Sequence, residues 1–110
     1  MIDWDRVATL KEEVGAEDFE EVVELFLEEV DAAIDTLATQ PNPQDLEEQL
    51  HFLKGSALSL GFRSFSDLCQ TGETAAAQSA DAAIDVDEIM TCYKQSRDAF
   101  LTQLQAKIAS

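Results

Sequence analysis

Basic residues are scarce in this chain of 110 residues. Seven Lys and Arg stand against 23 Asp and Glu, and the formal net charge at pH 7 is −16. Binding to nucleic acid or to anionic lipid needs Lys and Arg to replace counterions at the phosphates. The composition therefore argues against DNA, RNA and membrane partners. A large net charge of one sign also favours solubility and discourages self-association, so we expect a monomer.

Cysteine and long apolar runs are equally scarce. Cys69 and Cys92 have no CxxC spacing, and a single His completes no ligand set, so no disulfide framework or metal site is predicted. No apolar stretch approaches the roughly 20 residues that span a bilayer. The first residues show no charged, apolar and small-residue leader pattern. We expect a cytoplasmic protein in which both cysteines are small buried residues.

Glycine and proline are too few to interrupt the chain often. There are four Gly and two Pro, and Ala, Leu, Glu, Gln and Asp dominate, which favours helix. Asp3 and Gly15 are suited to begin and end a first helix, Asn42 and Pro43 to begin another, and Gly61 to end it. The apolar period of 3.6 predicts helices over residues 4–14, 17–39, 43–60, 63–78 and 86–107.

Four long amphipathic helices with short connections pack most simply as an antiparallel bundle. We therefore predict an all-α fold, an up-down-up-down four-helix bundle with a short extra N-terminal helix, in which residues 1–110 form a single domain. The expected core stripe of the second helix is Phe19, Val22, Val23, Phe26, Val30, Ile34 and Leu37. That of the third helix is Leu46, Leu50, Leu53, Ala57 and Leu60.

The single histidine, His51, lies in the third predicted helix. At about 100° per residue it falls ~140° from the core stripe, which should expose it to water. Gly55 lies beside it on the next turn, although Gly is unfavourable inside a helix. There it would clear the surface for a bulky partner, while Lys54 supplies a positive charge for a bound anion. From geometry alone, a solvent-facing His and a Gly that allows close helix packing explain the pattern equally well.

The segment around this histidine resembles a known signature. Residues 51–57, HFLKGSA, are similar to the H-x-[LF]-K-G-[SA]-[SA] motif of histidine phosphotransfer domains. Leu60-Gly61 matches the break that follows, and Leu68-Cys69 through Glu73 matches the L-C-x-x-L-E pattern of the next helix. The likeness covers nearly the whole chain. One departure is Gly72, which stands where family members often have Leu and would loosen the helix that carries Glu73.

The resemblance implies a role for each matching residue. His51 would carry the phosphoryl group at Nε2, Lys54 would stabilise its oxygens, and Gly55 would admit the partner's active-site loop. Glu73 would hold Nδ1–H of the ring. The possible docking surface comprises Phe52, Leu58, Phe62 and Arg63, although Phe62 suits the core equally well.

The resemblance also implies a mechanism without a cofactor in this chain. His51 would accept phosphoryl from the aspartyl-phosphate of a response-regulator receiver domain, as on a hybrid histidine kinase, and pass it to another receiver. Mg²⁺ is expected on the receiver. The sequence has no GxxxxGK[ST] loop, which predicts a carrier rather than an enzyme with its own ATP site. Two alternatives stay open: an acceptor domain of a chemotaxis-type kinase, phosphorylated by a separate ATP-binding domain, and a helical bundle that binds partners without carrying phosphate.

Overall fold

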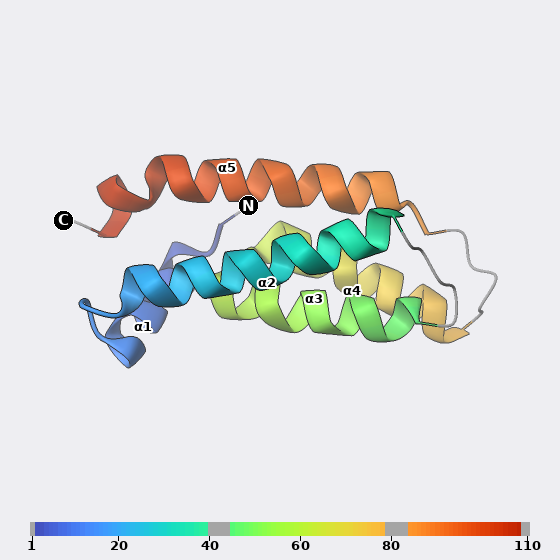
Figure 1. Cartoon of the computed structure of the whole chain (residues 1–110), viewed down its shortest axis with the longest axis horizontal. Coiled ribbons are helices and arrows are strands. Elements are labelled where there is room, and N and C mark those ends of the chain that lie inside the picture. Colours follow the sequence, from blue (N-terminus) through green and yellow to red (C-terminus); the bar gives the residue numbers. More distant parts are fainter. Residues whose placement is uncertain (1, 40–44, 79–83, 109–110) are drawn as a thin grey trace.

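Five helices account for most of the residues that the computed structural model describes, which are 2–39, 45–78 and 84–108. Figure 1 shows α2 to α5 lying along the long axis of a molecule of 47 × 21 × 20 Å, with α1 below the end at which α2 begins. Within the described residues the chain is all-helical, as predicted. The helices are α1 (Trp4–Val14), α2 (Phe19–Thr39), α3 (Leu46–Leu60), α4 (Arg63–Gln78) and α5 (Val86–Ile108).

The helix ends follow the local signals of the sequence. The side chain of Asp3 accepts a hydrogen bond from the backbone N–H of Arg6 at 3.2 Å, which caps α1. Gly15 ends the same helix with φ of +89°, a conformation that favours glycine. The predicted cap at Asn42 and Pro43, and residues 79–83 of the predicted loop, lie outside the described residues. The described part of α3 begins at Leu46.

The core is one cluster of apolar side chains drawn from every helix. In α2 the buried residues are Phe19, Val23, Leu27, Val30, Ile34 and Leu37. Leu27 was missing from the predicted stripe, whereas Val22 and Phe26 are only half-buried. The buried set follows spacings of 4, 4, 3, 4 and 3, the narrow seam of helices packed nearly side by side. In α3, Leu50, Leu53, Ala57 and Leu60 are buried as predicted, and Leu46 is half-buried.

Aromatic rings fill the end of the bundle that α1 covers. Phe62 lies 5.3 Å from Phe100 and 6.2 Å from Tyr93 between ring centroids, and Trp4 stacks on Phe100 at 5.8 Å. Tyr93 is 3% exposed, and its hydroxyl donates a hydrogen bond to Asp31 Oδ1 in α2 at 2.5 Å. This hydrogen bond gives the polar tip of a core residue its partner.

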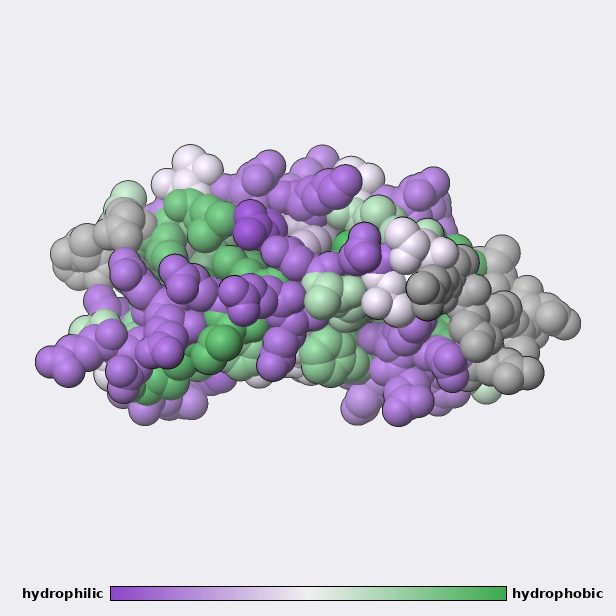
Figure 2. Space-filling model, viewed as in Figure 1, coloured by the Kyte–Doolittle hydropathy of each residue, from purple (hydrophilic) through white to green (hydrophobic). Residues whose placement is uncertain are grey.

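The surface is mainly hydrophilic, with a few large apolar residues left exposed. Figure 2 shows polar side chains over most of the visible face, interrupted by apolar patches that are most evident toward the end at which α1 lies. No helix in the described part of the chain combines the length and apolar character needed to cross a bilayer.

The two cysteines differ in their surroundings. Cys69 is fully buried, and burial raises the pKa of its thiol to about 12. Cys92 is only half-buried, so the prediction of two buried thiols holds for the first and is wrong for the second.

Candidate functional site

The site is built on the exposed face of α3. His51, Gly55 and Leu58 follow one another at spacings of four and three, and all three are exposed to solvent. The His51 side chain is 68% exposed. A Cβ atom added to Gly55 would meet nothing within 4 Å. The helix therefore presents an imidazole with open surface on the turn that follows it, as its angular position predicted.

A tight reversal after α3 brings α4 back alongside it. Gly61 has φ of +81° and donates its N–H to Leu58 O at 3.3 Å, while Phe62 N–H reaches Ala57 O at 2.8 Å. This pair of bonds is a Schellman motif, which requires the left-handed conformation at the glycine. The backbone of Asp3 also donates to Gly61 O at 2.7 Å. The reversal is thus held by hydrogen bonds to the end of α3 and by one from the residue before α1. Among the described helices, α3 and α4 share the most extensive contact.

Glu73 in α4 joins two residues of α3. Its Oε2 lies 2.7 Å from Nδ1 of His51, and its Oε1 lies 2.7 Å from Nζ of Lys54. The Glu73 side chain is only 15% exposed, and that of Lys54 is 19% exposed. One carboxylate therefore holds an exposed imidazole and a largely covered ammonium at the same time.

The charges of this group decide which ring nitrogen carries the proton. The hydrogen bond from Lys54, helped by the one from His51, lowers the pKa of Glu73 below its ordinary value of 4.5, against the opposing effect of burial. Glu73 is therefore ionised near neutral pH and can only accept hydrogen bonds. Nδ1 of His51 must then be the donor, which leaves Nε2 of the neutral ring with a free lone pair.

The structure separates the predicted docking residues into two kinds. Phe52 is 44% exposed and Leu58 is 56% exposed, so both are available to a partner. Phe62 is 1% exposed and packs against Phe100 and Tyr93, so the prediction that it forms part of a docking surface is wrong. The residue after the Gly61 reversal points into the bundle, as the hydrophobic position of a Schellman motif does.

Arg63 is exposed at the start of α4. It lines a shallow hollow with Leu58, Gly61 and Asp67. Measured along α3, Gly61 of the reversal comes ten residues after His51, or roughly 15 Å at 1.5 Å per residue. Arg63 therefore belongs to the rim of the exposed face rather than to the surroundings of the imidazole.

Two features of the site were not predicted. Lys54 points toward Glu73, so in this state its charge is paired rather than free. Gly72 does not loosen α4, because it is buried in a continuous helix that spans Arg63–Gln78. The sequence did carry a signal for the role of Gly72. A Gly inside a helix, next to a Glu that faces the neighbouring helix, suggests that two backbones approach closely.

Comparison with known families gives one match, and the matched residues include His51, Lys54 and Glu73. The model of the Hpt domain matches residues 21–108, which leaves α1 outside the match. No curated protein and no solved structure is similar enough to give a match. The chain therefore belongs to the Hpt family of histidine phosphotransfer domains, phosphocarriers rather than enzymes, which act in two-component signalling with response-regulator receiver domains and histidine kinases.

Proposed function

We propose that His51 is the phosphoacceptor of a phosphorelay intermediate. The observation that carries the proposal is the ring itself, 68% exposed and held through Nδ1 by the ionised Glu73. The lone pair of Nε2 attacks the phosphorus of a receiver's aspartyl-phosphate. A P–N bond forms, the P–O bond to the aspartate breaks, and the aspartate leaves as a carboxylate. Transfer to a second receiver runs the same step in reverse.

The residues around His51 support this chemistry in distinct ways. Glu73 stabilises the tautomer with a free Nε2, in the way that a carboxylate orients the histidine of a catalytic triad. Lys54 contributes a positive charge to the phosphoryl oxygens, for which it exchanges its present partner, Glu73 Oε1. Gly55 keeps the adjacent surface clear for the receiver loop that carries the aspartate.

The partner's active site supplies what this chain does not. Among the described residues, no three or more His, Cys, Asp or Glu side chains are grouped so that they could hold a metal ion. The Mg²⁺ of the proposed reaction is assigned to the receiver. Phe52 and Leu58 provide exposed apolar area beside the site, and Arg63 provides charge at its rim. We propose a cytoplasmic monomer in which residues 1–110 form a single antiparallel four-helix domain without an ATP site of its own.

The test is phosphoryl transfer from a purified, labelled receiver domain. Wild-type protein is expected to take up acid-labile label within the time in which the receiver loses it, and His51→Gln is expected to take up none. Label on His51→Gln contradicts the assignment to His51. A wild-type protein that takes no label from any cognate receiver, but does so from an ATP-binding kinase domain, indicates the chemotaxis-type acceptor instead. The absence of label from either source contradicts the carrier function.

A further inference from the structure

The residue before Glu73 has very little space on one side. Gly72 is buried in α4. A Cβ atom added to it would lie 2.9 Å from the Cδ1 methyl of Leu50 in α3, closer than carbon atoms approach one another in folded proteins. That methyl is the far end of a flexible side chain, but Leu50 is fully buried, so the methyl can turn aside only among packed neighbours. The absence of a side chain at Gly72 therefore allows α3 and α4 to approach this closely.

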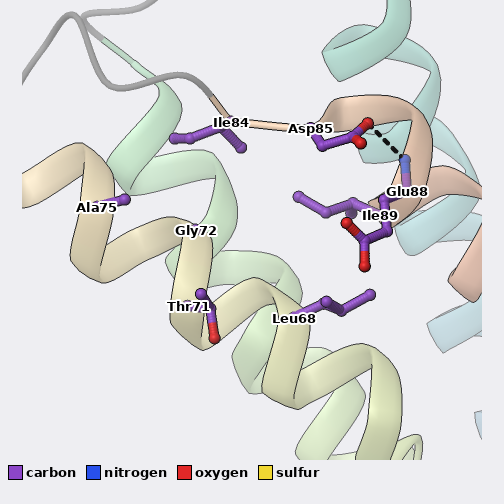
Figure 3. A pocket seen from close by; sticks show the side chains of 8 residues that line it. All are labelled: Leu68, Thr71, Gly72, Ala75, Ile84, Asp85, Glu88 and Ile89. Carbon is purple, nitrogen blue, oxygen red and sulfur yellow. Dashed lines mark hydrogen bonds between the residues drawn. The ribbon is translucent and has the colours of Figure 1, made fainter.

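The other side of the same residue has room. The added Cβ would lie 3.6 Å from a methyl of Ile84 and 3.7 Å from one of Ile89, which are ordinary contact distances. A cavity of about 230 Å³ opens there, with Leu68, Ile84 and Ile89 among its walls. Figure 3 shows Gly72 on α4 facing this cavity, with the two isoleucines across it. The restriction at Gly72 thus comes from α3 and not from α5.

The place of this contact links it to the site. Leu50 immediately precedes His51 in α3, and Gly72 immediately precedes Glu73 in α4. The close approach therefore occurs at the level of the hydrogen bond that joins Glu73 to His51. A hydrogen bond of 2.7 Å weakens quickly as its atoms separate. A small separation of the helices at Leu50 is enough to lengthen it.

We propose that Gly72 is a positioning residue for phosphoryl transfer. By lacking a side chain it sets the distance between α3 and α4 at which Glu73 reaches both His51 and Lys54. Its effect on the reaction rests on the proposed function of His51, whereas its effect on the ring does not. The opposing tendency is helix propensity, because Ala is more favourable than Gly inside a helix. If Gly72 had no close neighbour in α3, its replacement by Ala would therefore stabilise α4.

The test is a cycle of three variants: Gly72→Ala, Leu50→Val and the double variant. Nitrogen NMR of the His51 ring reports which nitrogen carries the proton, and transfer from a phosphorylated receiver reports the rate. Glu73→Ala defines the signal of a ring that has lost its partner. We expect Gly72→Ala to shift the ring signals toward those of Glu73→Ala and to slow transfer by about tenfold, the size of effect seen when a metal-bound histidine loses its outer hydrogen-bond partner. Leu50→Val, which removes the obstructing methyl, is expected to keep the wild-type signals.

The double variant decides between the proposed contact and a general disturbance of the fold. Restoration of the wild-type ring signals and of at least half of the wild-type rate in the double variant supports the proposal. Wild-type ring signals in Gly72→Ala overturn it, and so does a shifted signal that Leu50→Val fails to restore. A cycle that behaves as expected in the ring signals, in a protein that takes no phosphoryl group, refutes the function of His51 and leaves the positioning by Gly72 in place.

Discussion

Two pairs of helices in this bundle are joined in opposite ways. α3 and α4 share the most extensive contact of any pair, are linked by a two-residue reversal and approach closely at Gly72. α2 and α5 share far less contact. Polar side chains connect each pair. Between α3 and α4, Glu73 holds the exposed ring of His51, whereas between α2 and α5 Tyr93 reaches Asp31 from inside the core.

The difference shows how a single fold separates reactivity from stability. Glu73 holds an imidazole that is still 68% exposed, so its hydrogen bond adds little burial but fixes which nitrogen is free. The ring of Tyr93 packs against Phe62 and Phe65, burial raises the pKa of its hydroxyl strongly, and Asp31 accepts a hydrogen bond from that hydroxyl. Polar contacts of the first kind should therefore matter for transfer, and those of the second kind for folding.

The largest expected effect is that of Gly55→Gln, which should block the receiver's approach to His51 while stabilising α3. Gly55→Gln places a long side chain beside His51, and we expect transfer to fall by about a hundredfold or more because the reacting atoms are held apart. Stability should rise by about 0.5–1 kcal/mol, since Gly inside an exposed helix is replaced by a better helix former. Thermal unfolding and transfer assays measure the two effects. Undiminished transfer in this variant contradicts the assigned role of Gly55.

The next effect concerns the partner of the ring. Glu73→Ala removes the acceptor for Nδ1–H, and we expect transfer to slow by about 10–100-fold while the helical content stays as in wild type. Glu73→Gln is the matched control, because its carbonyl oxygen can still accept that hydrogen bond although it carries no charge for Lys54. Equal losses in the two variants would indicate that charge, and not the tautomer of the ring, is what Glu73 contributes.

On the α2–α5 side the expected effect is on stability alone. Asp31→Ala leaves the hydroxyl of Tyr93, a residue only 3% exposed, without its acceptor, at a cost of about 1–3 kcal/mol. Tyr93→Phe removes the donor as well and should cost less, about 0.5–1.5 kcal/mol. Denaturant unfolding gives both values. A change in the rate of transfer comparable to that in Glu73→Ala would show that the two sides are not separate.

The smallest effect is the pH dependence of the site. Folding lowers the pKa of Glu73, so its ionised form stabilises the native state at pH above 4.5, and this contribution is lost as the pH falls through the lowered value. The stability difference between wild type and Glu73→Gln should therefore be present at neutral pH and shrink in acid. Denaturant unfolding at a series of pH values measures it. A difference that grows as the pH falls would contradict the lowered pKa.

Features that depend on one helix at a time were predictable from the sequence. The bounds of α1 and α4 follow from caps and breaks, and the exposure of His51, Gly55 and Leu58 follows from the helical angle. The contact between Glu73 and His51 was implied by family resemblance and is present. These predictions need only the period of the helix or a matching motif.

Features that depend on the distance between helices were not predictable in the same way. The angular position of Lys54 allowed a free cation, but the nearby carboxylate of Glu73 pairs with it. Leu27 was left out of the core stripe because Phe26 beside it is as apolar, and only the direction of the neighbouring helices decides between them. Gly72 looked like a weakness within α4 because Leu50, the residue that requires it, lies 22 positions earlier in the chain.

The hydrogen bonds that join α1 to the end of α3 have a consequence for the order in which the protein folds. The guanidinium of Arg6 donates through Nε to Ser59 O, a residue 53 positions later, and the backbone of Asp3 donates to Gly61 O. α1 is synthesised before the other four helices and can become helical early. Its docking site, however, does not exist until α3 and the reversal have formed. Closing so long a loop is costly in entropy, so α1 should dock late. Refolding followed by the fluorescence of Trp4, which stacks on Phe100, would then lag behind the recovery of helix.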